Sequence, residues 1–524
     1  MKKLAVALLL ASIAIFSICS VSGADADEDE QAIIIDGIHY DTIDGRAIVS
    51  GTDEVSPPEH IVIPEFISYE GQSYPVEAIN PSAFAVDGIV SISIPKTVND
   101  IGMYSIRSMT LQEITVDPAN EYYSSSEGVL YDVFKYILLK YPAAKTDESF
   151  YAPRGLIDID MEAFSENKYV KEIDLPDTVK TINASAFDGC SALEKLNYDG
   201  TYNNLPKDVL IVETRAFAGC TSLKELVLNQ SLKVINAYAF MSSGLEYVYL
   251  PFSISSIEEG AFSGCPLKTI DSDNNTYLSI DNVLYEIRSN TKTLLAYPAG
   301  TEAETFIFPS DVNYIGSNAF NGCQHLKTVE LNNGLNTITS WAFNCCKSLE
   351  TVKMSSSIII VEGLAFYECE NLKNIEFGTR TSVLEPFCFS DTGVVDLVIP
   401  DTITNVGLGA FSECKNLRTV EFSDSSVFVD QDVFVECFNL ESIYIPGSDV
   451  TLVPGSFGVG NDSQPAIVTL TVNKDLQLPN VLGNDYTTLE IVIIGERPYP
   501  YENLIGVAVC IAILVGIIYA VREV

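Results

Sequence analysis

Cysteine is the residue type whose spacing most suggests chemistry in this chain of 524 residues. Of the 12 cysteines, eight follow a phenylalanine by three residues: Cys190, Cys220, Cys265, Cys323, Cys346, Cys369, Cys414 and Cys437. In an exported protein such a series suggests disulfides, and thiolates also bind metals. The same place holds Ser243 and Thr392 in other copies of the segment, so it requires a small side chain, and most of the thiols are expected to be buried and free. Cysteines arranged as a ladder also do not converge on one metal ion.

Residues that catalyse acid–base or nucleophilic reactions are scattered along the chain. The three histidines, His39, His60 and His325, have no repeated acid, base or nucleophile beside them, and a catalytic site needs such groups within reach of one another. The stretch DSDNN at 271–275 offers oxygen ligands for calcium, but it lacks the spacing of a known loop, which favours a solvated turn. We therefore predict no enzymatic activity, no metal site and no cofactor.

The elements that carry these residues form an internal repeat. An Ala-Phe pair, or a close variant, recurs mostly every 22 or 23 residues, with Ile106 at the anchor place of a degenerate copy. The other anchors are Phe84, Phe164, Phe187, Phe217, Phe240, Phe262, Phe320, Phe343, Phe366, Phe389, Phe411, Phe434 and Phe457. A repeat of this length is typical of a solenoid, in which each coil is stable only between its neighbours.

Each coil contains the pattern of a half-buried strand. After Phe343 the apolar residues are Leu349, Val352 and Met354, and the last two are separated by one polar residue, as expected of a strand with one buried face. Glycine, asparagine, serine and proline then predict a turn. Two gaps of 58 residues, before Phe164 and Phe320, contain related stretches, "VLYDVFKYILLKYPA" and "VLYEIRSNTKTLLAYPA". We interpret these stretches as larger coils with an inserted hairpin.

The two ends predict export and membrane attachment. Lys2 and Lys3, followed by an apolar run and small residues, are typical of a secretory signal peptide, and residues 503–521 are apolar over a length sufficient to span a membrane. We divide the chain into a signal peptide (1–23), an N-terminal β cap (24–80), the solenoid (81–457) with inserted hairpins near 117–153 and 271–309, a C-terminal β cap and stalk (458–502), a transmembrane helix (503–521) and a cytoplasmic tail (522–524).

Net charge narrows the range of partners. The formal charge of −41 would repel a phosphate backbone, which argues against nucleic acid. Four sequons are candidate glycosylation sites in an exported chain: Asn183, Asn229, Asn274 and Asn461.

The repeated pattern A-F-x-x-C-x-x-L-x-x-[IV]-x-[LIF], together with the two "VLY…YPA" inserts, resembles the BspA-like leucine-rich repeat family over about residues 33 to 457. The resemblance implies a right-handed solenoid of short parallel strands, about 22–23 residues per coil, on an adhesive microbial surface protein. The tail departs from that pattern because it has no cell-wall sorting motif, so we expect the membrane span to anchor the chain.

Candidate ligand-binding residues are those that interrupt the polar outer pattern. The stretch LEYVYL is expected to expose Tyr247 and Tyr249. Trp341, Leu364 and Phe387 share one place, two residues before the anchor, in three successive coils. These three residues either form an apolar strip for protein or glycan contact, or pack over the adjacent turn.

The sequence thus favours a non-enzymatic, membrane-anchored surface protein. Its predicted partner is a protein or glycan on another cell or in the matrix. The alternative is a structural component of the cell envelope that assembles through lateral contacts between solenoids.

Overall fold

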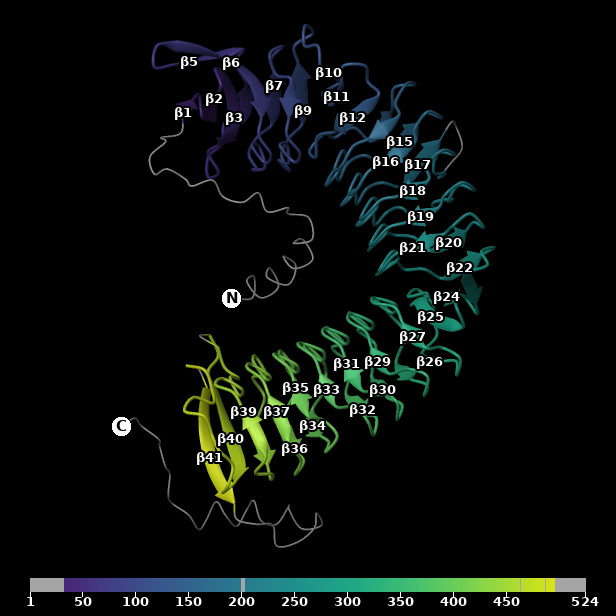
Figure 1. The fold of residues 1–524 in the computed structure, drawn as a ribbon, viewed down its shortest axis with the longest axis vertical. Helices are drawn as coiled ribbons and strands as arrows, with labels where there is room; N and C mark the ends of the chain where they lie inside the picture. Colours follow the sequence, from purple (N-terminus) through teal and green to yellow (C-terminus); the bar gives the residue numbers. More distant parts are fainter. Residues whose placement is uncertain (1–32, 199–202, 462, 486, 495–524) are drawn as a thin grey trace.

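The computed structural model describes residues 33–198, 203–461, 463–485 and 487–494. The described chain consists of strands and turns, with no α-helix, and its coils stack into an open C-shaped arc (Figure 1). Within these ranges no helix is long and apolar enough to cross a membrane. The predicted signal peptide and transmembrane helix lie outside them. The parallel-strand solenoid itself is confirmed.

One strand of each regular coil belongs to a ladder of longer strands, termed the long ladder. Its parallel pairing places residues of successive coils side by side, as in the series Val329, Val352 and Ile375. The long ladder comprises β4 (His60–Val62), β7 (Ser91–Ile94), β9 (Glu113–Val116), β13 (Ser149–Tyr151), β15 (Glu172–Leu175), β17 (Lys195–Tyr198), β20 (Tyr247–Leu250), β22 (Thr269–Ser272), β26 (Thr305–Ile307), β28 (Thr328–Glu330), β30 (Thr351–Lys353), β32 (Asn374–Glu376), β34 (Asp396–Ile399), β36 (Thr419–Phe422), β38 (Ser442–Ile445), β40 (Ala466–Asn473) and β41 (Thr487–Ile494).

A second ladder of strands of two or three residues, termed the short ladder, precedes the anchor phenylalanine in each coil. Figure 1 shows β19 and β21 of this ladder nearer the inside of the arc than β20 and β22. The short ladder comprises β8 (Asp100–Ile101), β14 (Asp158–Ile159), β16 (Thr181–Ile182), β18 (Ile211–Val212), β19 (Val234–Ile235), β21 (Ser256–Ile257), β27 (Tyr314–Ile315), β29 (Thr337–Ile338), β31 (Ile360–Val361), β33 (Val383–Leu384), β35 (Asn405–Val406), β37 (Val427–Val429) and β39 (Val450–Leu452).

The first described residues form antiparallel strands next to the first coil. These strands are β1 (Ile33–Ile35), β2 (Ile38–Ile43), β3 (Arg46–Thr52), β5 (Phe66–Tyr69) and β6 (Gln72–Ile79). Strand β3 pairs in parallel with β6, and β6 with β8, so this sheet continues into the short ladder. At the other end of the arc, β40 and β41 pair in parallel over eight residues (Figure 1).

The anchor side chains form continuous aromatic stacks inside the solenoid. From Phe164 to Phe262 and from Phe320 to Phe457, successive ring centroids are 4.7–6.2 Å apart and the rings are stacked. The tyrosine of each YPA stretch extends a stack backwards: Tyr141 lies 4.9 Å from Phe164, and Tyr297 lies 4.8 Å from Phe320. These tyrosines therefore take the place of the anchor phenylalanine in the two coils that carry an insert.

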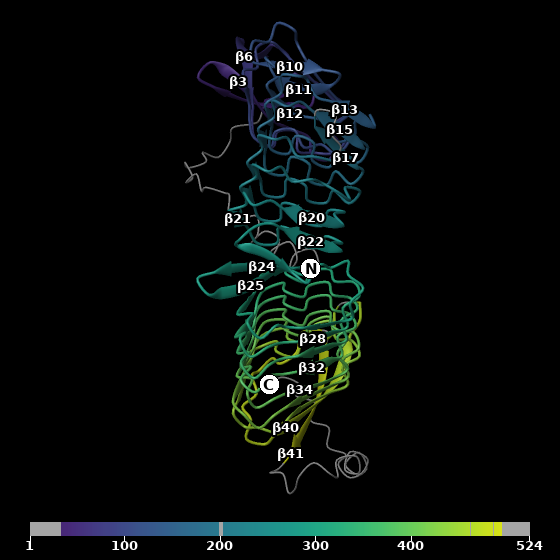
Figure 2. The ribbon, with the colours of Figure 1, turned by 90° about the vertical axis from the view of Figure 1, so that its right-hand side faces the viewer.

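The two inserted hairpins are built alike. The first consists of β10 (Tyr123–Ser126), β11 (Val129–Asp132) and β12 (Ile137–Lys140); the second consists of β23 (Tyr277–Ile280), β24 (Val283–Arg288) and β25 (Thr291–Ala296). Strands β24 and β25 project from the side of the stack (Figure 2). Each 58-residue gap thus contains an antiparallel hairpin.

The middle strand of each insert separates two hydrophobic cores. In β24, Leu284 belongs to the core that precedes it, whereas Val283 and Tyr285 belong to the core that follows. In β11, Leu130 and Tyr131 divide in the same way. Because alternate side chains of a strand point in opposite directions, one strand closes one core and opens the next.

Candidate binding surface

Trp341, Leu364 and Phe387 occupy a place where the backbone is left-handed in every coil. Their φ angles are 61°, 61° and 58°. A positive φ also occurs two residues before each of the other anchors, at Ser82, Tyr104, Glu162, Ser185, Arg215, Tyr238, Gly260, Asn318, Gly409, Asp432 and Gly455. This conformation favours glycine or asparagine and is costly for bulky residues. Large apolar side chains at this place therefore need a compensating contact or a function.

The structure brings the three residues together but does not leave them equally exposed. Leu364 is only 9% exposed and belongs to the interior, whereas Trp341 and Phe387 are half-buried. The ring of Trp341 meets Tyr367 edge-on, with centroids 6.2 Å apart. Of the two alternatives, the burial of Leu364 favours packing for this residue over a continuous exposed strip. A role in ligand binding stays a prediction for Trp341 and Phe387.

Two half-exposed residues of the short ladder lie in the same coils. Ile360 and Val383 pair across β31 and β33 and point to the opposite side from the buried Val361 and Leu384. We term Trp341, Ile360, Val383 and Phe387 the apolar surface. Sequence reasoning missed the two ladder residues because strands of two residues show no alternation. The sequence does contain a signal for these two residues, because the equivalent position in the flanking coils is polar.

Tyr247 and Tyr249 lie on β20 with their hydroxyl groups directed to carboxylates of the next coil. Tyr247 is 41% exposed and Tyr249 is half-exposed. The Tyr249 hydroxyl donates to Asp273, and this hydrogen bond raises the pKa of Tyr249. Partial burial raises the pKa of Tyr247, and the charge of Asp271 adds to the effect. The rings remain available for contact, but the hydroxyl groups already have acceptors.

The aspartates of the DSDNN stretch thus accept hydrogen bonds from tyrosines. Among the described residues, no group of three or more histidine, cysteine or acidic side chains is placed to hold a metal ion. Asp271 and Ser272 belong to β22 and Asn274 is buried, so only Asp273 and Asn275 fit the solvated turn that the sequence predicted.

The cysteine ladder has a second requirement besides small size. The Sγ atom donates to the carbonyl oxygen of the anchor phenylalanine in the preceding coil, as in Cys190 to Phe164 at 3.0 Å and Cys369 to Phe343 at 3.1 Å. The ten cysteines of the described ranges are free thiols. Thr392 at the same place donates instead to the carbonyl oxygen of Phe389 in its own coil. Sequence reasoning recognised the need for a small group but not the contacts that it makes.

Comparison with known families identifies the repeat. The family model described as "BspA type Leucine rich repeat region (6 copies)" matches residues 68–128, 144–268, 210–295, 296–407 and 382–463, which is more than half of the chain. The chain belongs to the BspA-type leucine-rich repeat family. The family resemblance drawn from the sequence is confirmed.

Several solved structures are similar to this BspA-type chain. A leucine-rich cell surface protein from Faecalibacterium prausnitzii is 24% identical, with 82% of this chain and 92% of that chain covered and a TM-score of 0.41. A leucine-rich repeat protein from Bacteroides ovatus is 20% identical, with 88% and 99% covered and a TM-score of 0.33. The pneumococcal vaccine antigen PcpA is 19% identical, with 89% and 99% covered and a TM-score of 0.40. The comparison with curated proteins gives no match.

The four sequon asparagines have structural partners in the BspA-type coils. Asn274 is 5% exposed, and its Nδ2 atom donates to Ile254 O at 2.7 Å. Asn229 likewise donates to two carbonyl groups of the preceding turn. The burial of its amide nitrogen in the folded coil argues against glycosylation at Asn274. Asn183 and Asn461, which donate to carboxylates, are half-buried and remain predictions together with Asn229.

Proposed function

We propose that this protein is a non-enzymatic, membrane-anchored cell-surface protein whose solenoid binds a protein or glycan on another cell or in the matrix. Membership of the BspA-type family suggests a protein-binding role at the cell surface. The sequence adds the signal peptide and the apolar segment 503–521, which support export and anchoring.

The observation that carries this proposal is the apolar surface. Trp341 and Phe387 stand in a left-handed conformation in which other coils have small residues, asparagine or aspartate, or large residues with a polar group such as Tyr238 and Arg215. Bulky side chains at such a place cost backbone energy, and both rings keep part of their area in contact with solvent. Partly exposed aromatic residues are frequent in binding hot spots, and here two of them lie two coils apart, with half-exposed Ile360 and Val383 in the short ladder of the same region.

The experiment is a binding screen of the full chain, held in detergent, against glycans, matrix proteins and the surfaces of other cells. The proposal predicts saturable binding to one of these classes. Absence of saturable binding across all of them, with the chain shown to be folded by its melting transition, would argue against a ligand-binding role. Protease treatment of intact cells tests exposure separately: the chain should be cleaved from outside.

A structural role in the cell envelope is the second candidate, and the C-terminal end of the arc favours it. Ile467 and Ile493 are 68% and 67% exposed on β40 and β41, and β41 pairs only with β40 among the described strands. An exposed apolar edge strand invites pairing with another chain. Self-association that disappears in Ile493→Lys would support assembly, whereas a monomer at all concentrations would exclude it.

A further inference from the structure

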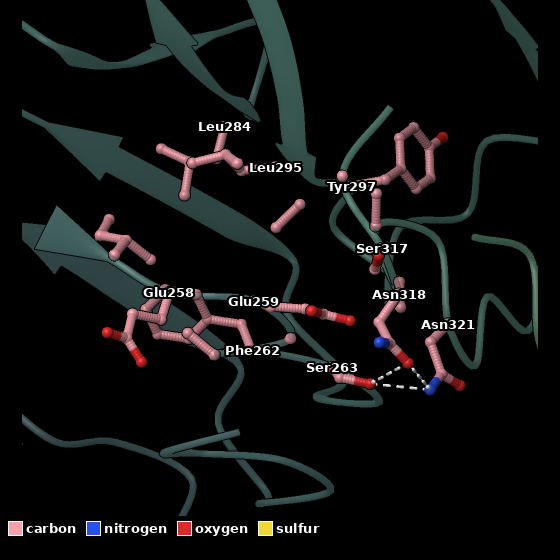
Figure 3. Close-up of a pocket in the computed structure, with 17 residues that line it drawn as sticks. Glu258, Glu259, Phe262, Ser263, Leu284, Leu295, Tyr297, Ser317, Asn318 and Asn321 are labelled. Carbon is pink, nitrogen blue, oxygen red and sulfur yellow. Dashed lines mark hydrogen bonds between the residues drawn. The ribbon is translucent and has the colours of Figure 1, made fainter. Parts of the chain in front are cut away.

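A cavity lies beside the second inserted hairpin. It has a volume of about 220 Å³ and is bounded by the end of β21, the turn after it, β25 and the turn that follows β27. Leu284 and Leu295 form an apolar wall (Figure 3). On the other side, Glu259 points toward Ser317 and Asn318 (Figure 3). One end of the cavity is thus apolar and the other is polar and acidic.

Glu259 is distinguished by its position as well as its direction. It stands three residues before its anchor, and no other coil has a charged residue at that place. Its carboxylate accepts the hydroxyl group of Tyr238 at 3.3 Å. Its neighbour Glu258 points away from the cavity in Figure 3 and accepts the amide of Ala237 at 3.1 Å. Glu259 therefore supplies the charge that faces the cavity.

The first inserted hairpin shows what the same space contains when it is filled. The pairing registers make the two hairpins directly comparable, because Lys140 lies opposite Leu130 in the first and Ala296 lies opposite Leu284 in the second. The next residue of each insert donates its amide to the coil that follows, at 2.7 Å in both. Lys140 and Ala296 are therefore equivalent.

Lys140 fills the equivalent space in the first hairpin. Its side chain is buried, and its Nζ atom donates to the carbonyl oxygen of Glu162 at 2.9 Å. The guanidinium group of Arg107 lies 4.0 Å from the centre of the Tyr104 ring and forms a salt bridge with the Glu162 carboxylate. The ammonium group of Lys140 thus donates to a backbone carbonyl group. The Tyr104 ring and the Arg107–Glu162 salt bridge lie next to it.

At the second hairpin, smaller residues replace every member of this arrangement. The equivalent pairs are Tyr104 and Gly260, Arg107 and Ser263, Lys140 and Ala296, Met161 and Ser317, and Glu162 and Asn318. All five smaller residues line the cavity. The cavity therefore corresponds to the space that Lys140 fills in the first hairpin. The ring of Tyr238 lies next to Gly260, where a Cβ atom would be 2.5 Å from its Cε1 atom, and takes up part of the space of the Tyr104 ring.

The charge balance changes along with the volume. The first hairpin places Lys140 and Arg107 beside the single carboxylate of Glu162, which leaves one positive charge. The second has no cation at either equivalent place and adds Glu259. Burial lowers the pKa of Lys140 to about 8, and Arg107 contributes to that lowering. In the second site, Ser263 stands in the place of Arg107. An ammonium group bound there would therefore not be repelled by a neighbouring positive charge.

We propose that the cavity beside the second hairpin binds a primary alkylammonium group, with its methylene chain against Leu284 and Leu295 and its nitrogen between Glu259 and the carbonyl oxygen of Asn318. The bound group takes the place that the side chain of Lys140 occupies in the first hairpin. A free amine and a lysine side chain of a polypeptide share this chemistry. This site is separate from the apolar surface, and its function does not depend on a ligand there.

The test is calorimetric titration of the full chain with n-butylamine, which has the chain length of a lysine side chain, and with n-butanol as the uncharged control. Saturable binding of the amine, with n-butanol binding at least tenfold more weakly, is the expected result. No saturable binding of n-butylamine, or equal binding of amine and alcohol, overturns the proposal. Titration with Nα-acetyl-lysine methylamide then distinguishes the sources: binding admits a lysine of a polypeptide, and its absence restricts the site to free amines.

Two variants locate the binding in the cavity. Ala296→Lys introduces the residue of the first hairpin and should abolish n-butylamine binding by filling the site. Glu259→Gln changes an exposed residue, leaves folding intact and should weaken binding about tenfold, as expected for loss of a charge-assisted contact. Lys268→Gln is the control, since it removes a charge directly before β22, at a residue that does not line the cavity. Unchanged binding in folded Ala296→Lys, or equal effects of Glu259→Gln and Lys268→Gln, would contradict the assignment.

Discussion

The Sγ atom of Cys346 lies 3.1 Å from the carbonyl oxygen of Phe320, the anchor of the preceding coil. The same contact links Cys437 to Phe411 at 3.0 Å and Cys265 to Phe240 at 2.9 Å. The carbonyl group of Phe320 also accepts the backbone amide of Cys323 at 3.2 Å, so the thiol supplies a second, weak donor within the volume of a small side chain. This contact explains why cysteine recurs in the core of a chain that is predicted to be exported.

The thiols of Cys220 and Cys265 are expected to be inert in the folded protein, because both are fully buried. Burial raises the pKa of Cys265 to about 12 and that of Cys220 well above its ordinary value. Since the thiolate is the reactive form, iodoacetamide should not label these cysteines as the pH rises from 7 to 9. In denaturant without reductant, labelling should rise with pH and reach all ten. Counting by mass spectrometry is the measurement, and blocked thiols in the unfolded chain would indicate disulfides.

Lys140 should make stability depend on pH. Its folded pKa of about 8 lies below the ordinary value of 10.5, so the unfolded chain binds more protons between these values and the free energy of unfolding rises with pH. The contribution amounts to about 3 kcal/mol at about 1.4 kcal/mol per pKa unit. Urea unfolding of the wild type and of Lys140→Met at pH 7, 8.5 and 10 measures the contribution of Lys140 to the free energy of unfolding. The difference between the two proteins should change across this range, and a constant difference would show that Lys140 titrates normally.

Gly409 is required by the ring of Phe387. A Cβ atom at Gly409 would lie 2.3 Å from Cε1 of Phe387, and the residue has a φ of +58°. Gly409→Ala is therefore expected to cost about 1–3 kcal/mol, as overpacked substitutions do. In Phe387→Ala the same glycine change should cost less, since only the backbone strain remains. A double-mutant cycle by urea unfolding measures the coupling, and additive effects would place the ring away from Gly409 in solution.

Trp341→Asn distinguishes a binding role from a packing role. Asn318 occupies the equivalent place with the same φ, so asparagine suits the backbone there. If the indole serves contact with a ligand, thermal stability should change little or increase. If its packing on Tyr367 matters more, stability should fall by about 3 kcal/mol or more, as for loss of a large buried side chain. A melting curve decides, and a large fall would leave Phe387 and the two tyrosines of β20 as candidates.

The sequence predicted the features that recur with the period of the repeat. The anchors, the inward residues of the long ladder and the two inserts were all expected, because a repeated side-chain environment selects repeated residue types. Tyr141 and Tyr297 were not recognised as anchors, since the chain reaches the anchor place after a hairpin and the spacing is lost.

The features that were not predicted depend on the backbone and on contacts between coils. The left-handed conformation at Trp341 and Leu364 could not be predicted, because tryptophan and leucine rarely adopt it. The cavity beside the second hairpin requires comparison of Lys140 with Ala296, and that equivalence follows from strand register. The outward direction of Ile360 could not be read from a strand of two residues.

The central claim, that the solenoid of a surface protein binds its partner through the apolar surface, is tested most directly by the adhesion of cells that display the full chain. Wild type, the double variant Trp341→Asn/Phe387→Asn, and Tyr238→Asn, which changes the same place outside the apolar surface, are compared on the glycan or protein that the screen identifies. The account predicts that the double variant binds at least tenfold more weakly at equal surface level, while Tyr238→Asn binds like wild type. Equal adhesion of all three proteins would contradict it.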